Sequence, residues 1–354
     1  MISILQASCS TRLSPYWISV GIIFALSATS CGEARQDHQL EFFAFGTEVT
    51  INLFGASDEQ ATRATDTLQS LFSDVDHNWY PWRPGELQAI NQAISGQLPV
   101  EVSPRLAIVI RRAAEIESVS NGRFNAGLGR LTELWGLHDL AQSPARIPDP
   151  AVIDTLIANR LSVARIHWDG NRLSTKQCAL MIDLGGIAKG AILEDSIHIL
   201  LKNGINDAIV NIGGDLSVLG NIKGRSAHIG IRSPAANDPI ASIDIVDRET
   251  IVTSGNYERY VEIGGQRYNH ILDPQSGYPV EHTASVTVVH DDAMLADAAA
   301  TALMVGGAEE FDALTEALDI DFALLIDASG DLRLTRSMGE RLHWIQDEPA
   351  QVRD

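Results

Sequence analysis

The chain has 354 residues, of which 45% are hydrophobic and 20% charged, with 46 acidic against 26 basic side chains. This apolar content can fill a sizeable core and excludes a generally disordered chain. The formal net charge of −20 argues against a nucleic-acid-binding surface, which needs a basic face, and against electrostatic docking on anionic lipid. An anionic ligand would have to be held by a metal ion, backbone amides or a few placed cations.

The N-terminal residues have the pattern of an export signal. Arg12 is the only charged residue before Cys31, and residues 16–28 are almost wholly apolar, a run too short for a membrane span of roughly 20 residues. Small residues follow, and the sequence that ends in Cys31 resembles a bacterial lipobox. We predict a signal peptide over residues 1–30 and a lipidated Cys31 that begins a polar tether over residues 31–40. An ordinary cleaved signal peptide is the alternative.

The three cysteines agree with export. Cys9 would leave with the signal and Cys31 would carry lipid, so only Cys178 would remain and no intrachain disulfide would form. Cys178 lies in an apolar, strand-like run, which predicts a buried structural cysteine. The mature chain would have 324 residues with 25 basic and 46 acidic side chains, a net charge of −21.

Hydrophobic periodicity predicts many strands interrupted by a few helices. Strands are expected over 45–53, 161–168, 179–184, 207–219, 227–232, 240–246, 250–253, 258–263, 284–290 and 321–327, and helices over 58–77, 104–119, 187–203 and 294–317. Gly264–Gly265 and Ser329–Gly330 mark hairpin turns, and residues 143–150 form a Pro-rich loop. This irregular order favours an α+β fold over a regular βαβ repeat.

One segment, residues 181–204, has the features of an anion site. An apolar strand ends in Gly185–Gly186 before a helix, Asp183 adds an acceptor and Lys189 adds a cation. Glycines let a ligand approach the backbone, and the free N–H groups of a helix start favour phosphate. A tight turn with an exposed lysine is the alternative.

A second segment, residues 291–307, offers oxygen ligands on one helix face. Asp297 and Thr301 are four residues apart, so they lie on the same side of the expected helix. Carboxylate and hydroxyl oxygens are hard ligands that suit Mg²⁺. A capping or helix-dipole role for Asp297 is the alternative.

Three further segments are candidates for ligand contact. His270 lies near the end of a strand in a polar, turn-rich context, although a structural histidine is the alternative. Tyr80 and Trp82 lie in a Pro-rich loop, where aromatic rings stack on a flat ligand or close a core edge. Residues 121–138 place glycines before an apolar helix, in a packing loop or a loop that contacts a ligand.

The order of the motifs carries more information than any one of them. FGTEV, a Trp- and Pro-containing loop that ends in ELQAIN, GRFNAGLG, LWGLH, DLGGIAKG, NIGGD, TSGNYERY, NHILDPQSGYP and ADAAATAL follow one another over residues 42–307. This succession resembles the FAD:protein FMN transferase family, also called ApbE. The resemblance implies one large α+β unit over residues 41–345, related to the T-fold, with antiparallel sheets and flanking helices. It also implies an enzyme that uses Mg²⁺ to transfer FMN from FAD to a Thr or Ser hydroxyl of an acceptor flavoprotein and releases AMP.

The resemblance assigns roles to the matching positions. Asp297, Thr301 and the backbone carbonyl of Gly186 match metal ligands, and His270 matches the histidine that would accept the proton of the acceptor hydroxyl. Contacts with FAD are expected from Phe45, Tyr80, Arg123, Phe124, Asn125, Asp183, Lys189 and Ile271.

The sequence departs from the family pattern in a few places. Asn125 stands where Asp is usual, so an acceptor oxygen is kept and a charge is lost; Phe45 stands where Met is frequent, and Gly85 where Ser is common. These changes affect how the flavin or adenine is seated. They leave the metal and histidine positions untouched.

Two other functions would use the same residues. One is a Mg²⁺-dependent FAD pyrophosphatase that gives FMN and AMP, and the other is a non-catalytic lipoprotein that binds FAD. For the transferase, the expected partners are FAD and an acceptor subunit of a membrane redox complex, with no nucleic acid. The protein is expected to be exported and lipid-anchored to a bacterial membrane, facing the periplasm. The inner membrane is expected, although Gly32 is not the Asp of the common inner-membrane retention signal.

Overall fold

The computed structural model describes residues 35–139, 147–235 and 238–345, and the backbone of 352–353. The predicted signal peptide and Cys31 lie outside these residues, as does the first part of the Pro-rich loop predicted over residues 143–150. In the described part of the chain, no helix is both long enough and apolar enough to cross a membrane.

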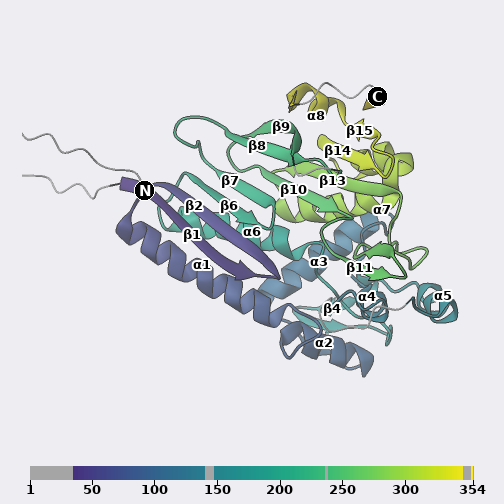
Figure 1. The fold of residues 1–354 in the computed structure, drawn as a ribbon. Coiled ribbons are helices and arrows are strands. Elements are labelled where there is room, and N and C mark those ends of the chain that lie inside the picture. The colour runs from purple at the N-terminus through teal and green to yellow at the C-terminus, as the bar shows by residue number, and fades with distance from the viewer. Residues whose placement is uncertain (1–34, 140–146, 236–237, 346–351, 354) are drawn as a thin grey trace, which may run out of the picture. The chain divides into compact units, whose positions relative to one another are not determined.

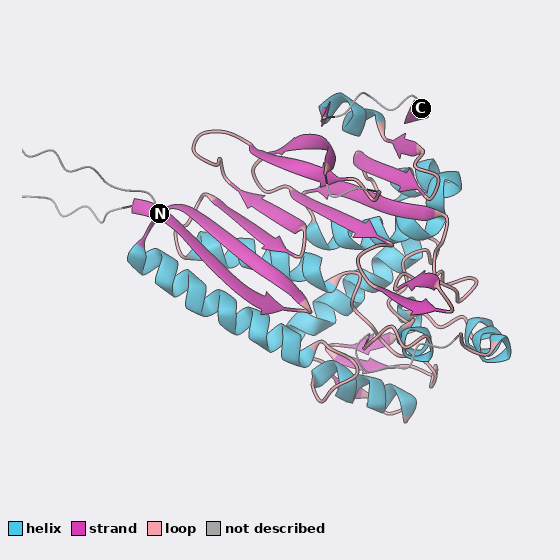
Figure 2. Cartoon of the chain, viewed as in Figure 1, coloured by secondary structure: helices cyan, strands magenta, loops and turns pink. Residues whose placement is uncertain are grey.

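Within the described residues, a nine-stranded sheet has the order β1-β2-β6-β7-β10-β13-β14-β15-β17 (Figures 1 and 2). Neighbouring strands are antiparallel except β15 and β17, which are parallel. The strands are β1 Arg35–Ala44, β2 Thr47–Ser57, β6 Ala208–Ile212, β7 Asp215–Leu219, β10 Thr250–Gly255, β13 Thr283–His290, β14 Phe322–Asp327, β15 Leu332–Leu334 and β17 Val352–Arg353. The predicted α+β fold with antiparallel sheets is confirmed.

Three smaller sheets occur in the described residues. One contains β8 Ala227–Arg232, β9 Pro239–Ile245 and β16 Leu342–Trp344, another contains β3 Val100–Glu101, β4 His167–Asp169 and β5 Arg172–Ser174, and the third is the hairpin of β11 Tyr260–Ile263 and β12 Gln266–Asn269. The hairpin turns at Gly264–Gly265, as predicted, and both glycines have positive φ angles of 61° and 83°.

The described helices are α1 Asp58–Asn78, α2 Glu86–Ser95, α3 Pro104–Val119, α4 Gly129–Leu134, α5 Pro150–Ala158, α6 Ala188–Lys202, α7 Ala293–Ala317 and α8 Arg336–Arg341. Of these, α1, α6 and α7 lie against one face of the large sheet, whereas α2, α4 and α5 lie away from that sheet (Figures 1 and 2). The predicted helices over 58–77, 104–119, 187–203 and 294–317 are confirmed as α1, α3, α6 and α7. Helix α7 is broken at Gly307, whose φ of 62° is not helical.

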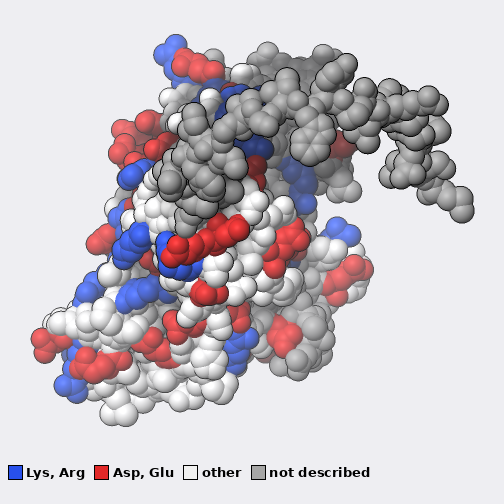
Figure 3. Space-filling view, turned by 90° about the vertical axis from the view of Figure 1, so that its left-hand side faces the viewer, with Lys and Arg blue, Asp and Glu red and all other residues white. Residues whose placement is uncertain are grey.

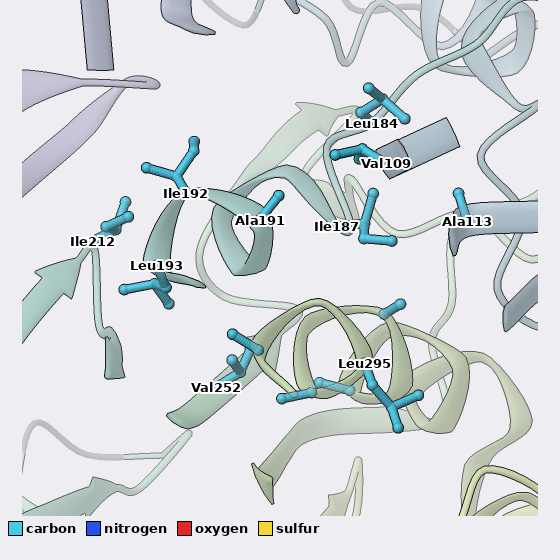
Figure 4. Close-up of a cluster of buried hydrophobic side chains, with 14 of the residues drawn as sticks. Val109, Ala113, Leu184, Ile187, Ala191, Ile192, Leu193, Ile212, Val252 and Leu295 are labelled. Atoms are coloured by element: carbon cyan, nitrogen blue, oxygen red, sulfur yellow. The ribbon is translucent and has the colours of Figure 1, made fainter. Parts of the chain in front are cut away.

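The main core lies between the sheet and helices α1, α3, α6 and α7. In β6, Ala208, Val210 and Ile212 are fully buried, whereas the alternate residues are not, so one strand face packs on the helices. Figure 4 shows side chains of α6, such as Ile192 and Leu193, among those of neighbouring strands and helices. Burial of these faces positions α6 and α7 under the sheet.

A second core covers part of the other sheet face. Val289 of β13 and Leu324 of β14 are buried together with Ile231 of β8 and Ile243 of β9. The small β8-β9-β16 sheet therefore packs on the strands that the helices leave uncovered. This layering gives both faces of β13 and β14 a buried environment, in agreement with their nearly continuous apolar sequences.

Three predicted strands differ from the structure. Residues 207–219 form two antiparallel strands, β6 and β7, joined by a turn at Gly213–Gly214. Residues 161–168 form a 3₁₀ turn at Val163–Arg165 before the short β4, and residues 179–184 have only an isolated bridge from Met181 to Leu128. Cys178 is exposed, so the prediction of a buried cysteine is also wrong. Leu180, Met181, Ile182 and Leu184 are buried. Their backbone bonds the Asn91 side chain and the loop residues Ala126 and Gly129 instead of a neighbouring strand.

The predicted tether also differs from the structure. Residues 35–40, expected to be its end, belong to β1, which pairs with β2 from Arg35–Ser57 to Ala44–Thr47. The compact unit accordingly begins at Arg35. A polar sequence is tolerated here because β1 is an edge strand and several of its side chains face solvent.

The surface charge is mixed on the face shown in Figure 3. Acidic and basic side chains are interspersed there between uncharged residues, with no continuous field of one sign. On this face the negative net charge does not form a single acidic patch. An anionic ligand would therefore depend on individual cations placed in a site.

Candidate active site

Helices α6 and α7 approach closely near their N-terminal ends. A Cβ atom at Gly190 would lie 2.2 Å from the main-chain oxygen of Ala293, so only glycine allows this crossing. The N–H of Gly190 donates a hydrogen bond to Oδ2 of Asp297 at 2.9 Å. The crossing thus brings Lys189, which precedes Gly190, into the same region as Asp297.

The three predicted metal ligands meet beside this crossing. A Cβ atom at Gly186 would lie 3.1 Å from Oγ1 of Thr301 and 3.3 Å from Cε2 of Phe124, so the missing side chain leaves a small cradle. Thr301 Oγ1 also lies 3.4 Å from the main-chain oxygen of Asp297, to which it donates. Carboxylate, hydroxyl and carbonyl oxygens are the donors that Mg²⁺ prefers, so these residues fit the predicted metal.

The carboxylate of Asp297 is poorly solvated. Its residue is 2% exposed, and burial raises the pKa of Asp297 to about 6 against the lowering effect of Lys189. Among the described residues, no group of three or more His, Cys, Asp or Glu side chains is arranged to hold a metal. A cation at Asp297 would therefore need hydroxyl and main-chain oxygens as well, and it would offset the cost of burying this carboxylate.

Lys189 is held by a second buried carboxylate. Its Nζ donates a hydrogen bond to Oδ2 of Asp215, a residue that is 1% exposed, and Oδ1 of Asp215 accepts the N–H of Thr253 at 3.1 Å. Burial opposes the charge of Lys189, but Asp215 and Asp297 outweigh it and raise the pKa of Lys189. The lysine is consequently charged, paired with Asp215 and stabilised electrostatically by Asp297 as well.

Asp183 caps the turn that precedes α6. Its Oδ1 accepts the N–H of Gly185 at 3.0 Å and its Oδ2 accepts the hydroxyl of Thr132 at 3.3 Å. Burial raises the pKa of Asp183, against these hydrogen bonds. Asn91 fixes the preceding backbone, because its amide oxygen and nitrogen bond the N–H and C=O of Ile182 at 2.8 and 2.9 Å.

His270 follows β12 and opposes Arg259 across the hairpin. The carbonyl oxygen of Arg259 lies 3.1 Å from the His270 main-chain nitrogen and 3.2 Å from Nδ1 of its ring. A carbonyl only accepts hydrogen bonds, so Nδ1 carries the proton and Nε2 keeps its lone pair. Burial, together with the charges of Arg259 and Lys189, lowers the pKa of His270 to about 4. The ring is therefore neutral near pH 7 and able to accept a proton at Nε2.

Phe45 lies in the turn between β1 and β2. Its φ of 55° is in the left-handed region, and hydrogen bonds hold the turn on both sides. Its N–H donates to Oδ1 of Asp76 at 3.0 Å, and its carbonyl accepts Nη2 of Arg259 at 2.7 Å. The predicted FAD contact Phe45 is thus bonded to Arg259, the residue that opposes His270 across the hairpin.

The aromatic loop forms a packed group around Tyr80. The Tyr80 hydroxyl donates to the main-chain oxygen of His138 at 2.5 Å, and the Trp82 ring lies 5.4 Å from the Tyr80 ring and 5.2 Å from that of His138. The Arg83 guanidinium lies 4.9 Å from the Tyr80 centroid. Burial raises the pKa of Tyr80, so this loop holds a neutral phenol near the site.

The side chains of residues 123–125 point in different directions. Phe124 is 3% exposed and faces Gly186, whereas Arg123 pairs with Glu310 and lies 3.6 Å from Asp273. The Arg123 side chain therefore interacts with two carboxylates, neither of which is a predicted metal ligand.

Asn125 has a local structural role. Its Nδ2 donates to the Leu161 carbonyl at 3.0 Å, and its Oδ1 accepts the N–H of Gly127 at 2.7 Å. It also lines a cavity of about 530 Å³, to which Leu128 and Ser162 contribute. Ile271, the remaining predicted contact, is 7% exposed within the main core.

Electrostatic coupling joins the central residues into one site. The charge of Lys189 acts on both Asp297 and His270, and the charge of Arg259 acts on Asp183 and His270. Residues from α6, α7 and the β11–β12 hairpin, far apart in the sequence, therefore converge.

Asp215 is a site residue to which sequence reasoning gave no role of its own. Asp215 directly follows the turn Gly213–Gly214. An acidic residue directly after a glycine turn is the sequence feature that could have indicated a site residue here. Its partner Lys189 lies 26 residues away in sequence, so only the folded chain reveals the pair.

The model of the ApbE family matches residues 45–326 of this chain. A FAD:protein FMN transferase of Treponema pallidum is 31% identical over 92% of this chain and 95% of its own length. That of Rhodobacter capsulatus is 32% identical over 93% of this chain, which spans only 63% of the relative's length.

Solved structures give the same result. The ApbE protein of Thermotoga maritima has a TM-score of 0.79 at 28% identity, with 86% of this chain and 99% of that chain covered. The flavin transferase ApbE of Vibrio cholerae has a TM-score of 0.76 at 27% identity, with 87% and 99% covered. The likeness therefore extends over almost the whole described fold.

Proposed function

The chain belongs to the ApbE family and is a flavin transferase, and from this premise we propose that it transfers FMN from FAD to a Thr or Ser hydroxyl of an acceptor flavoprotein. In this reaction Mg²⁺ is the cofactor and AMP is the second product. The observation that supports this most directly is the ion pair of charged Lys189 with Asp215, near enough to Asp297 and to neutral His270 to interact with both electrostatically. A cation, oxygen ligands and a base are the groups that cleavage of a phosphoanhydride requires.

FAD would bind with its pyrophosphate at the start of α6. Lys189 supplies a positive charge there, and the glycines at 185–186 allow close approach of the backbone. Phe45, Tyr80 and Ile271 would contact the flavin and nucleotide parts, and Asp183 would accept a hydrogen bond. The segment 123–125 would contribute through Phe124 and its backbone, because Arg123 and Asn125 already have protein partners.

Asp297, Thr301 and the carbonyl of Gly186 would hold Mg²⁺. When bound, the ion supplies charge neutralisation at the pyrophosphate. Thr301 and Gly186 contribute neutral oxygens, so the buried Asp297 is the charged ligand of the set.

In the transfer step, the acceptor hydroxyl oxygen forms a bond with the phosphorus of the FMN half. The bond from that phosphorus to the bridging oxygen breaks, and AMP leaves with the bridging oxygen and its electron pair. The hydroxyl proton passes to Nε2 of His270, whose Nδ1–H stays bonded to the carbonyl of Arg259. Lys189 faces the negative charge that develops on the phosphates.

The test combines the purified chain, FAD, Mg²⁺ and an acceptor protein that presents a Thr for flavinylation. Covalent, acid-stable flavin on the acceptor, with one AMP for each flavin, is the expected result. FMN and AMP without covalent flavin would instead identify a FAD pyrophosphatase. Bound FAD that is not turned over, with or without a chelator, would identify a storage protein.

The location is proposed on sequence grounds alone. Cys31 would be lipidated after removal of residues 1–30, which would anchor the enzyme at a bacterial membrane, facing the periplasm, near an acceptor in a membrane redox complex. The inner membrane is our proposal. Cys31→Ala should release the exported protein from membranes in cell fractionation, and a variant that stays bound would place the anchor elsewhere.

A further inference from the structure

Arg259 contacts two parts of the site that are distant in the sequence. Its main-chain carbonyl accepts hydrogen bonds from both the backbone and the ring Nδ1 of His270, at 3.1 and 3.2 Å. Its guanidinium donates to the carbonyl of Phe45 at 2.7 Å. One residue therefore fixes the orientation of the histidine and the turn that carries a flavin contact.

The turn at Phe45 needs this support. Phe45 has a φ of 55° and Gly46 one of 73°, so two consecutive residues adopt left-handed backbone conformations. Asp76 holds the N–H of Phe45 and Arg259 holds its carbonyl. A non-glycine residue in this region is retained only when its surroundings hold it there.

The charge of Arg259 has a second effect. The positively charged groups that act on the His270 ring are Arg259, from the segment before β11, and Lys189, from α6. A nearby positive charge disfavours the protonated ring, so both groups favour the neutral form, which accepts a proton.

We propose that Arg259 is a positioning residue for flavin transfer. Its carbonyl orients the ring of His270, and its side chain holds the Phe45 turn in place. The charge of Arg259 favours the neutral form of the His270 ring. This proposal rests on the proposed function, in which His270 is the base. In this role Arg259 makes no bond with the reacting atoms.

Three variants separate the charge from the hydrogen bond. Arg259→Gln keeps a donor for Phe45 and removes the charge, whereas Arg259→Lys keeps the charge. Arg267→Gln is the matched control, because Arg267 belongs to the same hairpin and its guanidinium lies 4.5 Å over the Tyr260 ring. It removes an equal charge at a position with no contact to His270 among those described.

The primary readout is the titration of His270 itself, followed by NMR in histidine-labelled full-length protein and assigned with His270→Gln. In Arg259→Gln we expect the midpoint pH of the His270 titration to rise by about half a pH unit to one unit. The pH below which the transfer rate falls should rise by the same amount. Arg259→Lys and Arg267→Gln should keep the wild-type midpoint. High salt should reduce the difference, since Arg259 is exposed.

A wild-type midpoint in Arg259→Gln, or an equal shift in Arg267→Gln, would overturn the proposal. A transfer rate that falls in Arg259→Gln equally at all pH values, with an unmoved His270 titration, would also overturn it in favour of direct substrate binding. The NMR titration does not depend on turnover. If the wild-type protein transfers no FMN, the proposed function fails, and the effect of Arg259 on the His270 titration is still measured.

Discussion

The Nζ atom of Lys189 donates a hydrogen bond to a carboxylate oxygen of Asp215, whose other oxygen accepts the N–H of Thr253. Asp215 is only 1% exposed, so its charge is compensated almost entirely by protein groups. The pair joins the start of α6 to the β6–β7 turn and to β10. It holds the proposed phosphate-binding cation against the sheet.

Asp215→Asn should weaken this arrangement. Without the carboxylate, Lys189 loses its partner at the site, so we expect FAD to bind about tenfold more weakly, a loss of about 1.4 kcal/mol. We also expect a fall of about 2 kcal/mol in the free energy of unfolding, below the range for a fully buried pair because the Lys189 side chain is 32% exposed. Fluorescence titration with FAD and urea unfolding measure the two effects. The double variant with Lys189→Met should regain stability, and unchanged FAD affinity in Asp215→Asn would contradict the role of the pair.

His270→Gln should abolish transfer, with a loss of at least about 100-fold, and leave FAD affinity within about twofold, because a general base contributes to the chemical step. The pKa of His270 is lowered to about 4 in the folded chain. The unfolded chain then binds the proton more readily, so wild-type stability is lost as pH falls from about 6.5 to about 4. His270→Gln should lose less stability over this window in urea unfolding. His167→Gln, a change at an exposed strand residue, is the control, and equal transfer in wild type and His270→Gln would remove His270 from the mechanism.

Asp297→Asn should remove the response to Mg²⁺. We expect Mg²⁺ to raise the melting temperature of the wild-type protein, since a ligand that binds only the folded state at about 100 times its Kd adds about 2.7 kcal/mol of stability. The variant should show no such rise and no transfer. Asp291→Asn is a matched control, since Asp291 lies in the same segment with its side chain 82% exposed. An equal Mg²⁺ effect in Asp297→Asn would place the metal elsewhere.

Asn125→Asp should destabilise the protein, even though it introduces the residue that is usual in the family. The amide Nδ2 of Asn125 donates to the Leu161 carbonyl, and a carboxylate would place an acceptor there. We expect a cost of about 1 to 3 kcal/mol for the carbonyl left without its donor. Thermal unfolding checks this, with Asn125→Ser as a variant that keeps an acceptor for Gly127 without adding a charge. An increase in stability with Asp would show that Leu161 and Asn125 rearrange freely.

Much of the fold was predictable because it depends on local patterns. Helices α1 and α3 have amphipathic sequences with clear start signals, such as Ser57, whose side chain caps α1 together with Gln60. The hairpin turns at 264–265 and 329–330 were equally clear, since glycine adopts the required positive φ. The failures were at 161–168 and 179–184, where buried apolar residues have no neighbouring strand, and at β1, whose polar sequence forms a strand only through its pairing with β2.

The motif sequences alone were sufficient to identify the family and to propose His270, Asp297, Thr301 and Lys189 as site residues, because the residue types at a site are set by its chemistry. Only the tertiary structure decided how they work together. The pairing of Lys189 with Asp215 and the contact of Arg259 with both Phe45 and His270 join segments from different parts of the chain. Burial and electrostatic neighbours, which shift the protonation of His270 and Asp297, exist only after the chain has folded.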